Sequence, residues 1–404
     1  MRNNRFMTSS TLMTTTSTQP PLDWLNIAVF VGLPVLALIL IPGWGIYAGY
    51  DSFQWLWALA FLYLNGLSIT GGYHRLWAHK AYDASPALKW FFALWGAGAL
   101  QNSILIWASD HRRHHRHVDD NNLDPYSAGR GLWFSHVGWM LREYDSRVTG
   151  LSNAKDLERD PIVMFQHNHY VKLMLLMNLG LPLLLGIWHG DIIGTLLIVG
   201  LLRLIVNHHV TFFINSLAHF WGTRPYTEDN SARDNGFLAF LTYGEGYHNY
   251  HHIFQTDYRN GIRWWQWDPT KWMIKASEKL GLASNLTTIS DFKIQRAILD
   301  TEFQRASREL DQADSSDTLR ATLEREYQMF TDSINQWKVL QAERYERTKA
   351  DLGGVLEERK HQLQQKWEQA AVRTQFKELE YSLKMQRKRL ELLMQQIQLQ
   401  AQTV

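Results

Sequence analysis

Histidine clusters are the residues of this 404-residue chain whose types and spacing can carry chemistry. Residues 111–115 read HRRHH and residues 248–252 read HNYHH, so each cluster has imidazoles at positions i, i+3 and i+4. Residues at that spacing share one face of a helix. A looser pair, His74 and His79, lies five residues apart. Because neutral imidazole is the commonest metal ligand in proteins, the repeated spacing favours a shared metal centre over scattered core histidines.

The number of candidate ligands predicts two metal ions rather than one. A site of imidazoles without thiolates suits Fe, Cu, Zn or Ni, and the chain has no cysteine. The lack of cysteine also excludes disulfides, iron–sulfur clusters and cysteine nucleophiles. One ion takes about four to six ligands. The candidates number nine: His74, His79, His111, His114, His115, His219, His248, His251 and His252.

Four apolar segments are long enough to cross a membrane. They are residues 25–41, 53–72, 171–188 and 192–220. If a fifth apolar stretch, 87–107, also crossed, the first histidine pair and the HRRHH cluster would lie on opposite sides of the membrane. We therefore expect this stretch to lie in the membrane interface, with its tryptophans at that depth. The sequence predicts two helical hairpins that bring all the histidines to one side.

Charge placement predicts the orientation, because short cytoplasmic loops carry an excess of Lys and Arg. The connections 42–52 and 189–191 contain neither residue, whereas 75–159 and the chain after Arg224 contain many. We expect a multi-pass integral membrane protein with both termini and the active site cytoplasmic, at the inner membrane if the source is bacterial. The formal net charge of +2 gives no general attraction to nucleic acid.

The two ends of the chain differ in composition from the membrane domain expected over 21–288. Residues 1–20 are rich in Ser, Thr and Asn, which is typical of a disordered tail. Residues 289–404 are rich in Gln, Glu, Lys and Arg, with apolar residues at helical spacing. This pattern favours helices that form a coiled coil and self-associate, and a solvated helix without a partner is the alternative. Breaks are expected at 314–317 and 353–354.

With their neighbours, the histidine clusters resemble the stearoyl-CoA (acyl-CoA Δ9) desaturase family of membrane fatty acid desaturases. The resemblance covers roughly residues 25–285. It rests on GGYHRLWAH (71–79), WASDHRRHH (107–115), FSHVGW (134–139), NSLAH (215–219), GEGYHNYHH (244–252), YRNG (258–261) and WDPTKW (267–272). It implies an all-α membrane protein in which four transmembrane helices stand under a cytosolic helical cap that holds two irons. The C-terminal helical extension lies beyond it.

The resemblance also implies roles for individual residues. One iron would be held by His74, His79, His111, His115 and His252, and the other by His114, His219, His248 and His251, with Asn215 reaching it through water. Asp110 and Glu245 stand beside ligands, where each either orients an imidazole or lies on a helix surface. The family's tunnel residues match Gln101, Asn102 and Trp107, for which membrane anchoring is the alternative. Asp110 is a further predicted substrate contact.

The activity that the resemblance implies is O2-dependent desaturation of a saturated long-chain acyl thioester. Two hydrogens leave adjacent methylenes and a cis double bond forms, with Δ9 favoured. The sequence contains no HPGG haem-binding stretch and no GxGxxG fingerprint, so an external ferredoxin, rubredoxin or cytochrome b5-like donor is implied. Ser109 stands where the family commonly has a basic residue for the CoA phosphates. Acyl-CoA is favoured, and carrier-protein and phospholipid-linked chains stay open.

Two rival functions share some of these features. A membrane di-iron hydroxylase has the same histidine pattern and differs in where the oxygen goes. A metal transporter needs ionisable residues along a path at mid-membrane. Here the clusters lie at one face, and the first and third apolar segments carry no charge apart from Lys172 at one edge. The sequence therefore favours the enzyme.

Overall fold

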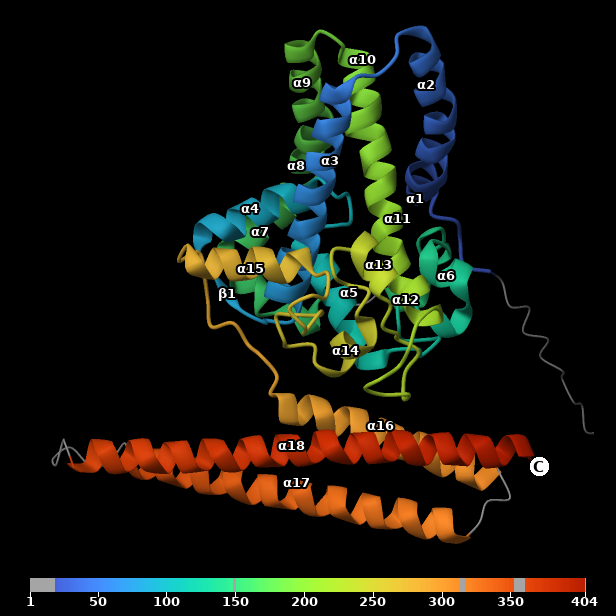
Figure 1. Ribbon diagram of the computed structural model, residues 1–404. Helices are drawn as coiled ribbons and strands as arrows, with labels where there is room; N and C mark the ends of the chain where they lie inside the picture. Colours follow the sequence, from blue (N-terminus) through green and yellow to red (C-terminus); the bar gives the residue numbers. More distant parts are fainter. Residues whose placement is uncertain (1–18, 148–149, 313–316, 352–359, 404) are drawn as a thin grey trace, which may run out of the picture.

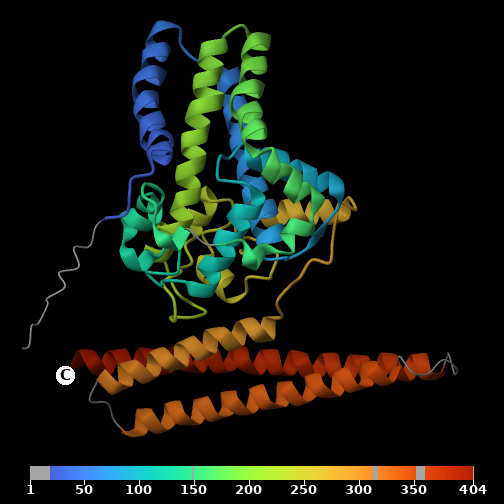
Figure 2. The ribbon, with the colours of Figure 1, turned by 180° about the vertical axis from the view of Figure 1, so that it is seen from behind.

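The computed structural model describes residues 19–147, 150–312, 317–351 and 360–403. It has three parts: upright helices, a cap of short helices at one end of them, and a bundle of three long helices beyond the cap (Figures 1 and 2). Apart from residues 19–20 and Asp317, the predicted tail and the two predicted breaks lie outside the described residues.

Within the described residues, three helices are long and apolar enough to cross a membrane: Trp24–Tyr47, Tyr170–His189 and Ile192–Phe220. The first continues through Pro42, past the predicted end at residue 41. Short π-helical segments lie inside each. Their parts are α1 (Trp24–Ile27), η1 (Ala28–Gly32), α2 (Leu33–Tyr47), α8 (Tyr170–Leu175), η8 (Leu176–Gly180), α9 (Leu181–His189), α10 (Ile192–Thr195), η9 (Leu196–Leu202), α11 (Arg203–Asn215) and α12 (Leu217–Phe220).

The segment predicted to span at 53–72 lies inside a fourth upright helix, formed by α3 (Ser52–Leu67) and η2 (Ser68–Ala78). A capping box starts it: the Asp51 carboxylate accepts from the backbone N–H of Phe53, and the Gln54 side chain accepts from the N–H of Asp51. The helix packs against η9 and α11 and stands beside them in both views. A count of four spans stays a prediction.

The apolar stretch 87–107 forms two helices, so the prediction of one continuous interfacial helix was wrong. α4 (Pro86–Ala97) lies across the ends of the upright helices (Figure 1), and α5 (Ile104–His117) begins separately. Leu100 and Asn102 interrupt the chain between them with φ angles of 52° and 71°, left-handed values that a helix does not accept. The break lets α5 leave the membrane end of the cap and carry HRRHH inward.

The cap is built from short elements around a core in which η2 crosses α4. A Cβ on Gly72 would lie 2.6 Å from the Cβ of Phe92, so only glycine allows this crossing. Strands β1 (Asp83–Ala84) and β2 (Ala283–Ser284) pair antiparallel and join the end of the cap to its start. The other elements are η3 (Ala128–Arg130), α6 (Leu132–His136), η4 (Gly138–Met140), η5 (Asp145–Arg147), η6 (Ser152–Ala154), η7 (Leu157–Arg159), α7 (Pro161–Asn168), α13 (Gly236–Leu241), α14 (His248–Ile253) and α15 (Pro269–Lys279).

Three helices form the C-terminal bundle: α16 (Asp291–Gln312), α17 (Asp317–Asp351) and α18 (Lys360–Thr403). Successive helices run in opposite directions in both views. Apolar residues at helical spacing make its core, including Phe303, Phe330 and Leu383. The predicted helices are present in the described residues, whereas the predicted coiled coil and self-association remain predictions.

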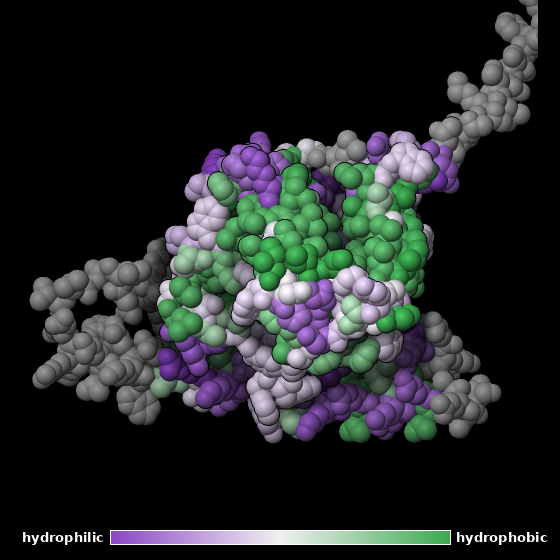
Figure 3. All heavy atoms as spheres, turned by 90° about the horizontal axis from the view of Figure 1, so that it is seen from above, coloured by the Kyte–Doolittle hydropathy of each residue, from purple (hydrophilic) through white to green (hydrophobic). Residues whose placement is uncertain are grey.

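Hydropathy separates these parts. Seen from the far end of the upright helices, apolar residues gather over them, and hydrophilic residues border them (Figure 3). Exposed apolar side chains such as Leu38 and Ile46 on α2 need an apolar surrounding, because an exposed surface of this kind is rare on a soluble protein. This exposed apolar surface fits an integral membrane protein.

Candidate metal centre

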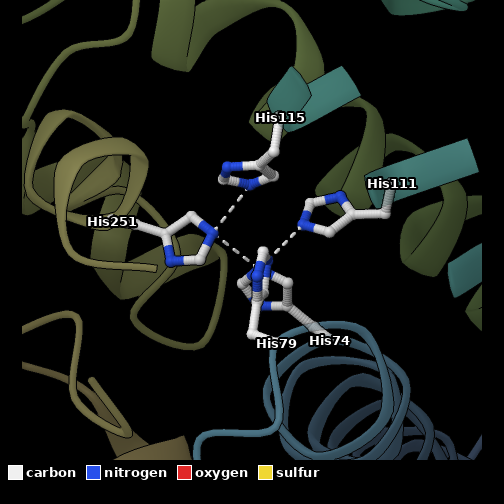
Figure 4. Close-up of side chains that lie close together, drawn as sticks. All are labelled: His74, His79, His111, His115 and His251. Atoms are coloured by element: carbon white, nitrogen blue, oxygen red, sulfur yellow. Dashed lines mark hydrogen bonds between the residues drawn. The ribbon is translucent and has the colours of Figure 1, made fainter. Parts of the chain in front are cut away.

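Nine imidazoles from four segments come together in the cap. They form two groups, within each of which the ligand atoms lie within 4.8 Å of one another. The five-histidine group contains His74, His79, His111, His115 and His251 (Figure 4). The four-histidine group contains His114, His219, His248 and His252. Every histidine that the sequence predicted as a ligand is in one of the groups.

The winding of η2 explains why a five-residue spacing works for His74 and His79. The N–H of His79 donates to the carbonyl of His74 at 3.0 Å, so this turn is π-helical. Residues five apart then lie close to one face, and the centroids of these two rings are 4.8 Å apart. In an α-helix the same two residues would diverge.

On both α5 and α14, the two histidines at positions i and i+4 belong to the same group and the third belongs to the other group. On α5, His111 and His115 lie at i and i+4 and join one group, while His114 faces the other. On α14, the i, i+4 pair is His248 and His252, whose Nε2 atoms are 3.1 Å apart. The sequence-based assignment exchanged His251 and His252. It was carried over from the family resemblance by motif position, and it was wrong because residues at i and i+4 share a helix face more closely than the i, i+3 pair that it implied on α14.

His219 reaches the four-histidine group after a break at the end of the third candidate span. Ser216, with φ −110° and ψ −80°, ends α11, and α12 then turns His219 toward His248, with 3.1 Å between the Nε2 atoms. The Nδ1 of His219 is 2.7 Å from the Ser231 hydroxyl, which donates to Asp119 at 2.6 Å. This contact links the membrane helix to the cap.

Two buried carboxylates orient one imidazole in each group. Glu245 accepts from Nδ1 of His74 at 3.0 Å, and Asp124 accepts from Nδ1 of His114 at 2.9 Å. Such partners fix the tautomer and the ring orientation of a metal-binding histidine. Glu245 therefore has the orienting role that the sequence left open. Asp124 was missed because it follows α5 in a loop, where no helical period links it to His114.

Arg75 stabilises the first of these carboxylates. Its guanidinium, 1% exposed, donates to Glu245 at 2.8 Å and to Asp268 at 3.1 Å. Burial alone raises the pKa of Glu245, but attraction to His74 and Arg75 and their hydrogen bonds outweigh it and lower the pKa to about 2. Asn260 donates to the other Glu245 oxygen at 2.7 Å. The carboxylate is therefore ionised and fully bonded.

The chemistry of the donor set fits metal ions. Because His74 and His114 give their Nδ1 hydrogens to carboxylates, their Nε2 atoms present lone pairs. These atoms lie 2.9 Å from Nε2 of His251 and 3.3 Å from Nε2 of His252. Each facing Nε2 has a second Nε2 neighbour, His115 at 3.0 Å for His251 and His248 at 3.1 Å for His252, and a ring nitrogen with at most one hydrogen does not bond well to both. Lone pairs are therefore left facing one another, and they repel unless a cation lies between them. Two cations, one for each group, would remove the repulsion.

Burial keeps the imidazoles in the neutral form that binds metal. It is the largest cause that lowers the pKa of His79, His111 and His115 well below the ordinary value, and the charge on neighbouring histidines adds to it. The pKa values of His251 and His252 are lowered in the same way. At neutral pH these rings are therefore ready to act as ligands.

A cavity of about 440 Å³ reaches the metal centre from the membrane end of the cap. Apolar side chains such as Leu25, Phe30 and Met174 line it near the upright helices, and His74, His111 and His248 line it near the centre. It therefore touches both histidine groups. A mostly apolar cavity with a few polar residues is the form expected for a site that binds a lipid chain.

The predicted substrate contacts lie on this cavity. All four, Gln101, Asn102, Trp107 and Asp110, line it, and so does Asn215, the predicted water-linked ligand. Gln101 donates to the Thr211 hydroxyl at 2.8 Å and so ties the loop after α4 to α11. Trp107 stacks on His111, with ring centroids 4.8 Å apart. Their binding of substrate remains a prediction.

Two other residues singled out in the sequence have local partners. Asp110 contacts Arg113 on its own helix at 3.2 Å while lining the cavity. Ser109 is 1% exposed and donates to Asn153 at 2.6 Å. It therefore packs inside the cap and does not face the cavity.

The family follows from comparison of the whole chain. The family model named fatty acid desaturase matches residues 52–284, which is more than half of the chain and contains every histidine of both groups. The chain belongs to the fatty acid desaturase family. The match ends before α16, so the C-terminal bundle lies outside it.

Curated relatives are similar over the same region. The probable acyl-CoA desaturase of Schizosaccharomyces pombe is 42% identical over 280 residues, covering 69% of this chain and 57% of the relative. Acyl-CoA desaturase 1 of Saccharomyces cerevisiae is 39% identical over 288 residues, covering 71% and 56%. The sn-2 palmitoyl-lipid 9-desaturase of Nostoc is 36% identical over 274 residues, covering 67% and 92%. The chain spans less than two thirds of each yeast relative.

Proposed function

We propose that this chain is a membrane fatty acyl desaturase that introduces a cis double bond into a saturated long-chain acyl group, using O2 and two external electrons. The observation that carries the proposal is the apolar cavity whose inner end is lined by His74, His111 and His248, so that a bound chain would pass both histidine groups. Family membership supports the same reaction.

The two histidine groups would each hold one iron, with Asn215 near the four-histidine group through water. A di-iron pair held there would supply O2-dependent removal of two hydrogens from adjacent methylenes. The chain's own residues fix where this happens. Glu245 and Asp124 hold His74 and His114 in the ligand tautomer, and burial in the cap keeps bulk water from the centre.

The cavity residues would position the acyl chain. Thr70 and Gln101 line the passage, and the bond from Gln101 to Thr211 fixes the loop against α11. Trp107 packs on His111 and presents an apolar surface next to the ligands. Asn102 and Asp110 would complete the contacts. Held in this way, two neighbouring methylenes would face the metal centre.

More specifically, we propose that the double bond forms at position 9 and that the substrate is an acyl-CoA. The printed names of the two yeast relatives favour acyl-CoA, and the Nostoc relative is named a 9-desaturase that acts on a lipid-linked chain. Incubation of the purified protein with stearoyl-CoA or with phosphatidylcholine of the same acyl composition separates the two carriers. Product from the phospholipid alone would contradict acyl-CoA as the substrate.

The proposed topology has four spans, with α3 and η2 as the second, and the termini and cap in the cytoplasm. α4 would lie in the interface. Electrons would come from a separate ferredoxin, rubredoxin or cytochrome b5-like protein. The excess of Lys and Arg on the cap side supports this orientation. Protease protection of the cap in sealed vesicles of known orientation tests it.

Self-association through the bundle is proposed separately from catalysis. If α16–α18 join two or more copies, truncation after residue 288 should separate the copies. The particle mass should then fall by more than the mass of the 116 deleted residues. Multi-angle light scattering of both chains in one detergent measures this. A mass difference equal to the deleted segment alone would contradict self-association.

Fatty-acid profiling in a desaturase-deficient host, with double-bond localisation, tests the function. We expect a new cis-Δ9 monounsaturated acid from the wild type and none from His115→Ala. The matched control is His189→Ala, since this histidine pairs with Asp51 at the far end of the upright helices. A hydroxylated lipid without an alkene, or an alkene that does not depend on His115, would contradict the proposal.

A further inference from the structure

A row of aromatic residues is exposed on the side of the cap next to the upright helices. Trp221 is 51% exposed, Phe237 62%, Phe240 52% and Trp272 41%. The residues Phe220, Trp221, Phe237, Phe240, Trp267 and Trp272 are here named the aromatic belt. Side chains of this size are normally buried in a water-exposed domain, so their gathering in one row indicates a surface for an apolar environment.

Ring contacts make the belt continuous. Trp221 lies 6.0 Å from Phe237, Phe240 lies 5.1 Å from Trp267, and Trp267 lies 5.3 Å from Trp272, measured between centroids. Phe237 and Phe240 share a face of α13 at i and i+3. The belt thus runs from the end of α12 across α13 to α15.

The belt begins where the third candidate span ends. Phe220 is the last residue of that span and is 45% exposed, and Trp221 follows it directly. α13 reads GFLAFL and contains no polar side chain. Figure 1 shows α13 beside α12, just below the ends of α3 and α11. Exposed aromatic residues on the cap therefore begin directly at the end of a candidate membrane span.

A contact between α3 and Tyr243, two residues after the end of α13, indicates the depth of this part of the cap. The Tyr243 hydroxyl donates to the carbonyl of Leu62 at 3.2 Å, and its ring lies 5.4 Å from that of Tyr63. Leu62 is about 15 Å along the helix from Ser52, at a rise of about 1.5 Å per residue. The hydrocarbon core is about 30 Å thick. If Ser52 lies at the far boundary of the core, the Leu62 carbonyl lies about half-way through it, so the Tyr243 hydroxyl and the adjacent end of α13 lie within its depth.

The far end of the belt has the composition of an interfacial helix. Lys279 is exposed on α15, the helix that carries Trp272, and so is Lys275, which pairs with Glu278 on the same helix. Tryptophan with nearby lysine is the combination found where protein meets the headgroups of anionic lipids. The position of the belt directly after a candidate membrane span favours lipid over a protein partner, because a protein partner would not require that position.

We infer that the aromatic belt is a membrane-binding surface whose occupant is the lipid of the cap-side leaflet. The belt inserts among the acyl chains, and the lysines of α15 meet the headgroups. The cap is thus partly immersed on the side of α13. The inference rests on the proposed membrane position of α3 and does not depend on the reaction catalysed.

Single cysteines can test this directly, because the chain has no cysteine of its own. Phe237→Cys, Phe240→Cys and Trp272→Cys are each labelled with a nitroxide in the full chain, reconstituted in vesicles that contain anionic phospholipid. Spin-label accessibility to O2, which concentrates in lipid, is compared with accessibility to a water-soluble nickel chelate. Leu38→Cys on α2, 76% exposed, is the lipid control, and Tyr381→Cys on α18, 66% exposed, is the water control.

We expect the Phe237 and Phe240 labels to have a high ratio of O2 to nickel accessibility, close to that of Leu38→Cys. The Trp272 label should lie between the two controls. A ratio equal to that of Tyr381→Cys at both α13 sites would overturn the inference, because the belt would then face water. Low accessibility to both reagents would also overturn it, because a second copy or another protein would then cover the belt.

Discussion

The cap and the C-terminal bundle are both helical, but different forces hold them. In the cap, buried charged and polar groups make the decisive contacts, as when Arg75, Glu245 and Asp268 form one network. In the bundle, apolar residues such as Leu383 and Leu390 fill the core, and ion pairs lie near the surface. In the cap, a substitution that leaves a buried charge without its partner should therefore cost much stability and displace metal ligands. In the bundle, a substitution should lower stability without affecting the ligands.

The largest effect is expected for Glu245→Gln in the cap. The change removes the charge that pairs with Arg75 and accepts from His74, and loss of one partner of a buried pair costs about 3–5 kcal/mol. We expect loss of the double-bond product, loss of bound metal and a lower melting temperature. The matched control is Glu278→Gln, which affects only an exposed pair with Lys275 on α15. Equal effects of the two variants would break the comparison.

A smaller loss is expected for Asp124→Asn. The amide oxygen can still accept from His114, but without a charge, and removal of such a partner typically lowers metal affinity or activity by about 10- to 100-fold. Iron content and turnover of the purified variant measure this. Asp120→Asn is the control, because the Asp120 carboxylate accepts only from backbone N–H groups of its own turn. A turnover like that of the wild type would show that Asp124 does not position His114.

In the bundle, Leu383→Ala should lower stability without lowering activity. Leu383 is fully buried, and removal of such a side chain costs about 2–5 kcal/mol. Hydrogen exchange of residues 291–403 should become faster, while turnover stays within about twofold. Leu392→Ala on the same helix, 61% exposed, serves as the control. Loss of activity in Leu383→Ala would mean that the bundle supports the metal centre.

The smallest effect concerns Asp156, which holds α5 to η2 through Arg112. Two hydrogen bonds from Arg112, at 2.7 and 2.9 Å, outweigh partial burial and lower the pKa of Asp156 below its ordinary value of 3.8. The folded form thus binds the proton less readily than the unfolded form. This stabilisation is present above about pH 4 and is lost as pH falls through the lower folded value.

Because Asp156 is about one third exposed, solvent reduces the contribution to about 1 kcal/mol or less. Melting temperatures of wild type and Asp156→Asn should differ at pH 7 and begin to converge as pH falls below about 4, meeting once it has passed the lower folded value. Glu326→Gln loses an ion pair with Arg389 in the bundle. Its melting temperature, compared with that of the wild type, measures the effect of one ion pair in that region. A difference between wild type and Asp156→Asn that persists at low pH would contradict this account of the carboxylate.

Periodicity accounts for what could be predicted from the sequence. The i, i+3, i+4 spacing on α5 and α14 placed six ligands in one centre, and apolar spacing predicted the helices of the bundle. The exchange of His251 and His252 was avoidable, since the i, i+4 rule was already available. The break at Leu100 and Asn102 was missed because the stretch was read as one apolar run, although asparagine readily adopts left-handed φ angles.

Contacts between distant segments account for what could not be predicted. Asp124 and Ser231 support ligands from loops, and Arg75 meets Asp268 across 193 residues of sequence. Such pairs depend on tertiary packing, which local spacing does not encode. The π-helical turn that brings His74 to His79 is likewise a backbone feature that residue spacing alone does not indicate.

The most direct test of the central claim is the number of metal ions in each chain. Protein expressed with iron and purified without chelator should contain two irons per chain, one for each histidine group, by mass spectrometry of the metal content. His79→Ala, in the five-histidine group, and His219→Ala, in the four-histidine group, should each lower the iron content. X-ray absorption should show nitrogen and oxygen ligands and no sulfur. One iron per chain in the fully loaded protein, or unchanged iron content in both variants, would contradict the two-ion account.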